Sequence, residues 1–353
     1  MNLSSCRIAV VGVTGVVGRE ILGILRSRDV PAANILALAS PRSAGTVIPY
    51  GDARLTVRAA LAGEFAGVDV ALFAASSSVA RDLVPHAVEA GALVVDNSSA
   101  FRLAAHVPLV VPEINPQAVR AGVGIRRVIA NPNCSTIIML VAIEPLRRHF
   151  GVRAIQVSTY QAVSGAGQAG LSALDDEIKA GAGSAGTKAT ESPFTEPCFL
   201  NVFSHNSAVD PETGINSEER KMIEETRKIL NLTAMAVTPT CVRVPVFRAH
   251  SQAMVVKLEH PASEVEVRRA YEGAAGVRVI DDRVGNRFPT PLKAAGGDDV
   301  LVGRLRPDPA VPLIDGRSDS WCLFACGDQL RKGAALNAIQ IAELTSLRGG
   351  PPR

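Results

Sequence analysis

A cysteine follows directly after an asparagine and a proline in the stretch NPNCST, residues 131–136. A thiol is a good nucleophile only when ionised, and the N-terminus of a helix favours the thiolate through its dipole and free N–H groups. The residues that follow predict such a helix, with Asn133 as its cap and Cys134 at its start. The N–H groups of that turn also suit an oxyanion. The alternative is an apolar cysteine in a strand-to-helix turn.

A thiolate that forms an acyl adduct needs a proton carrier, and histidine is the usual one. Among six histidines, His250 stands apart because it follows RVPVFRA at a predicted turn between strands, seven residues after Arg243. An arginine can grip a carboxylate through two parallel hydrogen bonds. The pair therefore suits substrate binding and proton transfer. We expect the other five histidines to be surface residues: His86, His106, His149, His205 and His260.

Two opposite charges stand three residues apart in NSEERK, at the predicted start of a helix. Glu218 and Lys221 would lie on one face of that helix. They suit a substrate that carries both signs of charge. The alternative is a solvated, salt-bridged helix turn.

A glycine-rich turn occurs near the N-terminus, in VVGVTGVVGRE. It places Gly12, Gly15 and Gly18 between a predicted strand and a predicted helix. In dinucleotide-binding folds such glycines let the backbone approach a pyrophosphate at the helix N-terminus. A tight turn without a ligand is the alternative.

Cofactor choice depends on the end of the second predicted strand, ALASPRSAG. Enzymes that select NAD usually place an acid there to hold the ribose hydroxyls. Here Ser40, Arg42 and Ser43 stand instead, and an arginine with hydroxyls suits the 2′-phosphate of NADP. The alternative is a solvated arginine in a loop.

The elements that position these residues follow from hydrophobic patterning. In the first third, buried-type strands alternate with helices, which predicts a parallel sheet covered on both faces. The predicted strands span residues 7–13, 35–40, 69–76, 93–99 and 126–133, and the helices 16–28 and 78–92.

Longer strands dominate after Cys134 and predict a mixed, largely antiparallel sheet. A helix over 135–150 comes first, followed by strands over 153–165, 234–246, 250–260 and 321–327, a Gly/Ala-rich loop over 180–193 and a final helix over 332–347. We therefore expect an α/β protein. Residues 1–133, completed by about 331–353, would form a Rossmann-type NADP-binding domain, and residues 134–330 an α+β catalytic and dimerisation domain.

Composition narrows the function classes. The chain has 353 residues, 47% hydrophobic and 20% charged, and a net charge of +3 without a concentrated basic face, which disfavours nucleic acid as a partner. Apolar runs such as IIMLVAI are too short to span a membrane. Six cysteines in so long a chain form no disulfide framework, and Cys322 and Cys326 have no nearby pair to complete a zinc site. With no room for a signal peptide before the first strand, we expect a cytoplasmic protein without a metal.

Eight stretches, in one order from about residue 8 to 345, resemble the aspartate-semialdehyde dehydrogenase family. They are GVTGVVG, SPRSAG, VVDNSSAFR, NPNCST, STYQAVSGAG, INSEERKM, RVPVFRAHS and LRKGAALNAIQIAE. The resemblance implies NADPH-dependent reductive dephosphorylation of L-aspartyl 4-phosphate to L-aspartate 4-semialdehyde through a cysteine thioester. That step serves lysine, threonine, methionine and diaminopimelate biosynthesis. It further implies a homodimer, with a tetramer as the alternative.

The resemblance also implies roles for individual residues. Cys134 would be the nucleophile, His250 the acid and base, and Gln161 would orient the acyl group. Arg243 would bind the substrate carboxylate and Glu218 its ammonium group. The phosphate would be held by Arg102, Asn133 and Lys221. The cofactor would be lined by Thr14, Gly15, Val16, Val17, Arg42, Ser43, Ser164, Gly165 and Gln329.

Two residues depart from the pattern of the family. Ala249 stands before His250 where glycine is common, and Gln329 stands where an asparagine near the nicotinamide is usual. We expect the imidazole to keep its place and the longer amide to keep its contact.

Three other functions compete with this one. N-acetyl-gamma-glutamyl-phosphate reductase shares the thiol chemistry, but its substrate has a blocked amine, which leaves Glu218 without a role. Glyceraldehyde-3-phosphate dehydrogenase is more distant, because NPNCST does not match its cysteine context well. A non-catalytic dinucleotide-binding relative would have lost the nucleophile or the histidine, and both are present.

Overall fold

The computed structural model describes residues 3–120, 127–184 and 186–345. The chain divides into two compact units. The first comprises residues 1–133 and 334–353, and the second residues 134–333. Of the predicted segments, residues 126, 185, 346 and 347 lie outside the described part.

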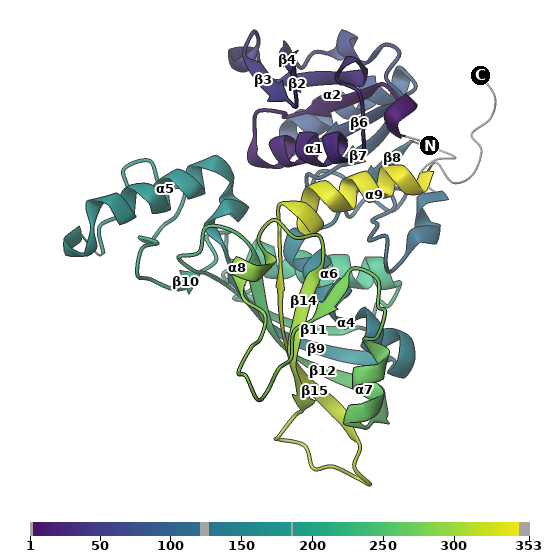
Figure 1. Ribbon diagram of the computed structural model, residues 1–353, viewed down its shortest axis with the longest axis vertical. Coiled ribbons are helices and arrows are strands. Elements are labelled where there is room, and N and C mark those ends of the chain that lie inside the picture. The colour runs from purple at the N-terminus through teal and green to yellow at the C-terminus, as the bar shows by residue number, and fades with distance from the viewer. Residues whose placement is uncertain (1–2, 121–126, 185, 346–353) are drawn as a thin grey trace. The chain divides into compact units, whose positions relative to one another are not determined.

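The first unit is built on a six-stranded parallel sheet in the order β5-β2-β1-β6-β7-β8. Figure 1 labels β2, β6, β7 and β8 of this sheet. Its strands are β1 (Ile8–Val11), β2 (Ile35–Ala39), β5 (Arg58–Ala59), β6 (Val70–Phe73), β7 (Leu93–Asp96) and β8 (Val128–Ala130). Helices α1 (Val16–Ser27), α2 (Ser77–Glu89) and α9 (Leu336–Thr345) belong to this unit, together with the hairpin β3 (Val47–Tyr50) and β4 (Ala53–Thr56). Its core joins side chains of the sheet to those of α1 and of the C-terminal α9.

The second unit is built on a seven-stranded mixed sheet in the order β10-β11-β9-β12-β15-β14-β13. Four neighbouring pairs are antiparallel, whereas β9–β11 and β13–β14 are parallel. The strands are β9 (Val152–Gln161), β10 (Phe203–Ser204), β11 (Ala236–Arg243), β12 (His250–Ala262), β13 (Val277–Val279), β14 (Val300–Pro307) and β15 (Ser318–Gly327).

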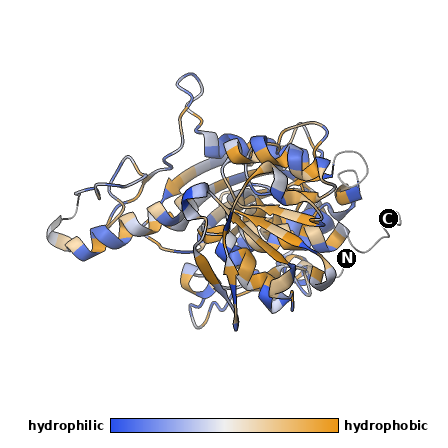
Figure 2. Cartoon of the chain, turned by 90° about the horizontal axis from the view of Figure 1, so that it is seen from above, coloured by the Kyte–Doolittle hydropathy of each residue, from blue (hydrophilic) through white to orange (hydrophobic). Residues whose placement is uncertain are grey.

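Five α-helices are described in the second unit: α4 (Cys134–Phe150), α5 (Gly167–Ala180), α6 (Ser217–Leu230), α7 (Glu264–Ala270) and the short α8 (Pro291–Ala294). Helix α4 is buried from Ser135 to Leu146. Such all-round burial explains why its sequence is apolar without a polar face. Hydrophobic residues concentrate on the sheet strands and on the helix faces turned toward them (Figure 2).

The predicted fold class is confirmed: a parallel sheet is followed along the chain by a mixed, largely antiparallel one. The described strands that hydrophobic patterning did not predict are mostly short ones, β3, β4, β5, β10 and β13, together with the longer β14. Helix α5 was also missed, since its GQAGLSALDDEIKA is rich in glycine and alanine. In the described part of the chain, no helix is both long and apolar enough to cross a membrane.

Candidate active site

Cys134 is the first residue of α4, as its sequence context predicted. It is half-buried, while the residues behind it in the helix are buried. The amide Nε2 of Gln252, a fully buried residue of β12, donates to the carbonyl oxygen of Ser135 at 2.8 Å. Gly333 lies on the thiol side, because a Cβ on Gly333 would come within 2.9 Å of the Cβ of Cys134. The hydrogen bond from Gln252 thus fixes the start of the helix, and Gly333 lies close beside Cys134.

Gln161 is the last residue of β9, and only 1% of it is exposed. Its Nε2 donates to Ser135 Oγ at 2.9 Å, one residue beyond Cys134, and lies 3.4 Å from Glu218 Oε1. The register of β9 with β11 pairs Gln161 with Arg243. Gln161 therefore lies between the start of α4 and the two charged groups, Glu218 and Arg243.

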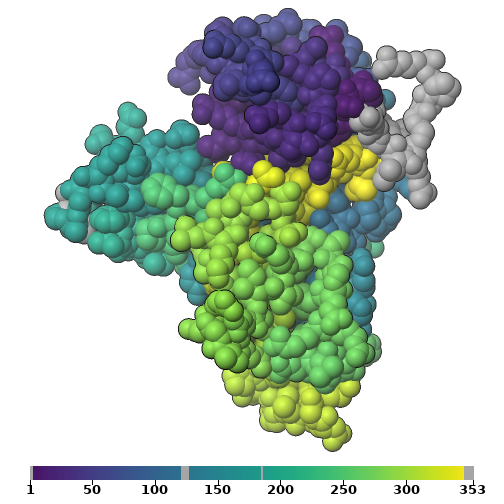
Figure 3. Space-filling view, viewed as in Figure 1, coloured from purple at the N-terminus to yellow at the C-terminus, as the bar shows by residue number. Residues whose placement is uncertain are grey.

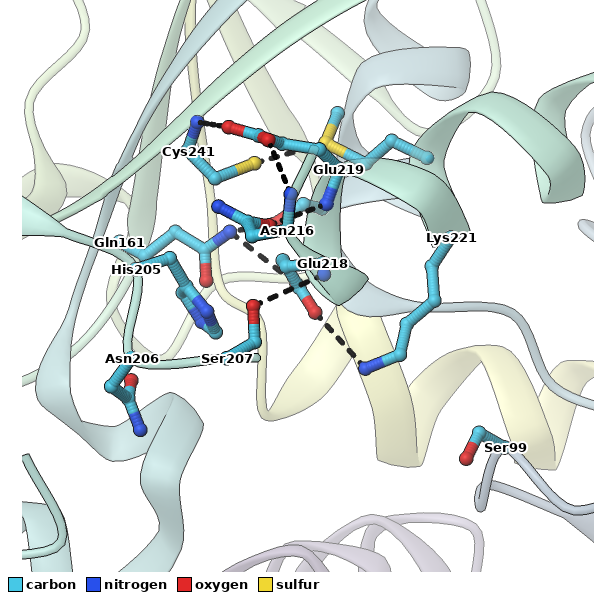
Figure 4. A network of polar contacts seen from close by, with 12 residues as sticks. Ser99, Gln161, His205, Asn206, Ser207, Asn216, Glu218, Glu219, Lys221 and Cys241 are labelled. Carbon is cyan, nitrogen blue, oxygen red and sulfur yellow. Dashed lines mark hydrogen bonds and ion pairs between the residues drawn. The ribbon is translucent and has the colours of Figure 1, made fainter. Parts of the chain in front are cut away.

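Glu218 and Lys221 lie in the first turns of α6, with Lys221 Nζ 3.3 Å from Glu218 Oε2 (Figure 4). The start of this helix is fixed by a capping box, in which Asn216 accepts from the N–H of Glu219 and Glu219 accepts from the N–H of Asn216. Glu218 is buried, whereas the side chain of Lys221 is 35% exposed. Because Glu218 is buried, the pair is not the solvated ion pair that was the alternative.

Arg243, at the end of β11, is 2% exposed. Its Nη1 donates to Ala162 O at 2.7 Å, and its Nη2 lies 3.0 Å from Asn206 Oδ1 and 2.8 Å from His205 Nε2. Its Nε has no hydrogen-bond partner among the described residues, and no described carboxylate forms an ion pair with it. Burial lowers the pKa of the guanidinium, and Glu218 opposes that shift. A buried cation to which no described carboxylate is hydrogen-bonded is suited to an anionic ligand.

His250, the first residue of β12, is fully buried. Its Nδ1 accepts from the N–H of Ala162 at 3.0 Å, so the proton of the neutral ring sits on Nε2. That Nε2 has no hydrogen-bond partner among the described residues. Burial, with Arg243 nearby, lowers the pKa of His250 to about 3. The resting imidazole is therefore neutral and presents an N–H.

The expectation that His205 is a surface residue was wrong. It is half-buried beside Arg243, whose Nη2 it faces through Nε2, and its Nδ1 has no partner among the described residues. Burial lowers the pKa of His205 to about 4. Nothing in its polar sequence context separated it from the other histidines, because its place depends on the edge strand β10, which ends at Ser204.

Gln329 forms two hydrogen bonds within the second unit. Its Oε1 accepts from the N–H of Ala249 at 2.9 Å, and its Nε2 donates to Ser164 Oγ. Ala249 has a φ of 73°, in the left-handed region that glycine occupies most easily. The amide of Gln329 thus supports a strained residue directly before His250. Gly165 lies close by, since a Cβ on it would be 3.1 Å from Arg243 Nη1 and 3.3 Å from His250 Nε2.

The glycine-rich turn of the first unit forms a close cradle. Gly12 has a φ of 87°, and a Cβ on it would lie 2.3 Å from the carbonyl oxygen of Ala74. A Cβ on Gly18 would lie 2.2 Å from Gly12 O. Helix α1 begins at Val16 with Gly15 as its N-cap, and no side chain caps its first N–H groups. This arrangement fits the pyrophosphate of a dinucleotide.

The other predicted residues of the first unit lie at several places in its fold. Ser40, Arg42 and Ser43 lie at the end of β2 and in the 3₁₀ turn Pro41–Ser43, and all but Ser43 are exposed. Thr14 and Val17 flank the start of α1. Arg102 is buried and donates to the carbonyl oxygens of Asn131 and Asn97. Asn133 is buried and immediately precedes α4.

Within the second unit, the structure brings the predicted residues to one end of the sheet: Cys134, Gln161, Ser164, Gly165, Glu218, Lys221, Arg243, His250 and Gln329. Figure 4 shows Gln161, Glu218, Lys221 and His205 turned toward one another. A half-buried thiol at a helix start, a neutral histidine and a buried arginine make a site suited to covalent chemistry on an anionic substrate.

Two protein-family models match the chain and define its class. The NAD binding domain of semialdehyde dehydrogenases matches residues 7–122, and their dimerisation domain matches residues 143–332. The chain is 43% identical to the aspartate-semialdehyde dehydrogenase of Synechocystis, over 98% of this chain and 99% of that protein. It is 39% identical to the Bacillus subtilis enzyme, over 95% and 96%. The crystal structure of aspartate semialdehyde dehydrogenase II from Vibrio cholerae, complexed with ASA, shares 37% identity and a TM-score of 0.89, covering 97% of this chain and 98% of that chain. The chain belongs to the aspartate-semialdehyde dehydrogenase family.

Proposed function

We propose that the protein reduces L-aspartyl 4-phosphate to L-aspartate 4-semialdehyde with NADPH, and runs the reverse reaction with phosphate and NADP. One observation carries this proposal: Glu218 and Arg243, 5% and 2% exposed, present opposite charges on either side of Gln161. The α-carbon of an aspartyl substrate carries an ammonium group and a carboxylate, which match an acid and an arginine. An N-acetylated substrate would leave Glu218 without an ammonium partner.

The reaction would begin with attack of the Cys134 thiolate on the acyl carbon. The carbon–sulfur bond forms, the bond between the acyl carbon and the phosphate oxygen breaks, and phosphate leaves, so that a thioester remains on Cys134. Arg102, Asn133 and Lys221 are proposed to hold the phosphate. The thioester carbonyl oxygen becomes negative in each tetrahedral intermediate, and the N–H groups at the start of α4 are suited to stabilise it.

One proton must enter in the direction of reduction, and it ends on the released phosphate. His250 is proposed to transfer that proton as the general acid and base, since its neutral ring presents an Nε2–H in the resting site. Gln161 is proposed to orient the acyl group, because its amide contacts the residue next to the nucleophile. Collapse of the second tetrahedral intermediate expels the thiolate and releases the aldehyde.

The cofactor, when bound, supplies a hydride to the thioester carbon. We assign it as NADP(H), because the end of β2 offers the exposed Arg42 and Ser40 together with Ser43 rather than an acid. The cradle of Gly12, Gly15 and Gly18 is proposed to receive its pyrophosphate. Ser164, Gly165 and Gln329 are proposed to lie along its nicotinamide half. We further propose a homodimer acting in the cytoplasm, in the pathway to lysine, threonine, methionine and diaminopimelate.

A phosphate-dependent spectrophotometric assay tests the proposal. Purified protein receives L-aspartate semialdehyde or N-acetylglutamate semialdehyde, each with NADP or NAD, with and without phosphate. We expect reduction of NADP only with the first aldehyde and phosphate. Turnover of the acetylated aldehyde instead would assign the other reductase activity and remove the role of Glu218. Cofactor binding without turnover of either aldehyde would identify a non-catalytic relative.

The variant Cys134→Ala tests the covalent step. Removal of the sulfur leaves no group to form the thioester, so we expect turnover below detection with NADPH binding and fold unchanged. Rapid mixing of the wild-type protein with aspartyl phosphate, without a cofactor, should release one phosphate per active site, and the variant should release none. Equal activity of variant and wild type would contradict a cysteine intermediate.

A further inference from the structure

No carboxylate of the described residues forms a hydrogen bond with Arg243, so its orientation depends on neutral contacts. Its hydrogen bonds use three of the five N–H donors of a guanidinium, all toward neutral acceptors: Ala162 O, His205 and Asn206. These bonds fix one edge of the group. They do not cover its flat faces, and a ligand carboxylate must reach the N–H groups that remain.

One face of the guanidinium lies on an aromatic ring. The Cζ of Arg243 is 5.4 Å from the centroid of the Phe194 ring. A cation over the face of an aromatic ring is attracted by the ring quadrupole, most strongly where water is excluded. Phe194 and Arg243 are each 2% exposed, so this contact is dry.

The Phe194 ring is itself fixed on its other sides. Its centroid lies 5.8 Å from that of Phe203 in an edge-to-face arrangement. Helix α5 passes close, because a Cβ on Gly170 would lie 3.1 Å from Phe194 Cζ and 2.3 Å from the carbonyl oxygen of Val163. Only glycine permits this approach. A small apolar cluster of Val163, Ala173, Leu174, Cys198 and Phe203 completes the pocket of the ring.

The segment that carries Phe194 has little secondary structure and is tied to α5 by one carboxylate. Glu177, 4% exposed, accepts from the backbone N–H of Ala189 at 3.1 Å, of Cys198 at 2.7 Å and of Phe199 at 2.8 Å. These contacts close a loop on both sides of Phe194. Helix α5 and this segment extend beyond the β10 edge of the second sheet (Figures 1 and 3), so few other elements can hold them.

We propose that Phe194 and Glu177 are positioning residues for substrate binding. The ring of Phe194 orients the guanidinium of Arg243 through its face, and Glu177 holds the segment that carries this ring. An acid in the position of Phe194 would also orient Arg243, but it would compete with the substrate carboxylate for the same cation. An aromatic face orients the cation and leaves its charge for the ligand. This inference rests on the proposed role of Arg243.

The test compares two ring deletions in one segment. Phe194→Leu removes the ring under Arg243, whereas Phe199→Leu removes a ring from the same apolar cluster that does not stack on the guanidinium. We expect Phe194→Leu to raise KM for aspartate semialdehyde about 2- to 30-fold, the range of a cation–π contact, with kcat changed less than about twofold. Phe199→Leu should leave KM within about twofold of the wild type.

Three further measurements separate a positioning role from general damage to the fold. With 3-aminopropanal, which lacks the α-carboxylate, the effect of Phe194→Leu on KM should disappear. In an Arg243→Lys background, Phe194→Leu should add little, because lysine cannot stack as a planar group. Glu177→Gln keeps the Phe194 ring but weakens the hydrogen bonds that hold its segment to α5. It should therefore also raise KM for aspartate semialdehyde.

The outcomes distinguish the two proposals. If the wild-type protein does not oxidise aspartate semialdehyde, the proposed function fails and this inference falls with it. If the wild type is active but Phe194→Leu and Phe199→Leu give equal KM values, the positioning role alone is wrong. A KM effect that persists with 3-aminopropanal would likewise overturn it, since that substrate has no carboxylate for Arg243.

Discussion

One glycine, Gly333, lies close enough to Cys134 that a side chain there would collide with the nucleophile. Gly333 lies in a single π-helical turn, Arg331–Ala335, and a Cβ there would come within 2.9 Å of Cys134 Cβ and 3.3 Å of Gln329 Cβ. We expect Gly333→Ala to displace Cys134, and a displacement of about 1 Å at a reacting group can cost about 100-fold in rate. The measurement is kcat/KM for aspartate semialdehyde, together with the rate of Cys134 alkylation by iodoacetamide.

The control for this variant is Gly63→Ala, a glycine with no heavy atom within 4 Å of the added Cβ and no positive φ. It should leave both rates unchanged. Wild-type kcat/KM in Gly333→Ala would show that the contact with Cys134 is relieved at no cost to the site.

Residue types with a chemical role could be predicted where a short motif carries them. NPNCST predicted a helix beginning at Cys134, and α4 begins there. NSEERK predicted Glu218 and Lys221 on one helix face, and they lie 3.3 Å apart. His205 and Phe194 could not be predicted, because each acts on Arg243 through contacts that bridge about 40 or more residues of chain. No local pattern encodes such a contact.

At the scale of elements, two helices of the second unit, α6 and α7, both begin with a capping box, but only α6 carries a residue of the site. Helix α6 has a capping box between Asn216 and Glu219, and α7 has one between Ser263 and Glu266. Loss of either cap should cost about 1 kcal/mol of stability. Only α6 carries Glu218 in its first turn, and Glu219 also accepts from the N–H of Cys241 in β11.

We therefore expect Asn216→Ala and Ser263→Ala to lower the urea midpoint similarly, and only Asn216→Ala to raise KM for aspartate semialdehyde, by several-fold. The single tryptophan, Trp321, is buried in β15 of the second unit and reports its unfolding by fluorescence. Equal KM values in the two variants would mean that Glu218 keeps its place without the α6 cap.

Elements were predictable where burial is uniform and missed where it is not. The strands of the first sheet are apolar because both faces are covered, and β1, β2, β6 and β7 are buried throughout. Strand β14 was not predicted because Gly303 and Arg304 interrupt its run of apolar residues, and Arg304 has a φ of 58°. Strand β10 has two residues and exists only through its pairing with β11.

At the scale of the whole chain, the order of strands along the sequence indicated two different sheets, but not their registers. The parallel pairing of β9 with β11 sets Gln161 beside Arg243, although the two residues lie far apart in the sequence. The antiparallel pairing of β12 with β9 sets Ser251 beside Tyr160, and so places His250 at the same end of the sheet. Register depends on the packing of every strand at once, and a single motif does not fix it.

The buried His250 and the half-buried His205 should make the second unit sensitive to acid. The pKa values of His205 and His250 are lowered to about 4 and about 3, mainly by burial, with Arg243 adding in the same direction and Glu218 opposing. In the unfolded chain both should have a pKa of about 6.5. Between pH 6.5 and the folded values, the unfolded state therefore binds protons that the folded state does not, so stability falls as the pH falls.

Each histidine should contribute up to about 1.4 kcal/mol of lost stability per pH unit in this window. We expect the urea midpoint followed by Trp321 fluorescence to be steady from pH 8 to 7 and to fall from pH 6.5 to 4.5. His205→Asn and His250→Asn should each flatten that slope, whatever they do to the midpoint at pH 7. Carboxylates elsewhere in the chain remain in both variants, so the difference in slope isolates the histidine. A slope equal to that of the wild type in both variants would mean that folding does not change the protonation of the two imidazoles, and that burial does not lower their pKa values.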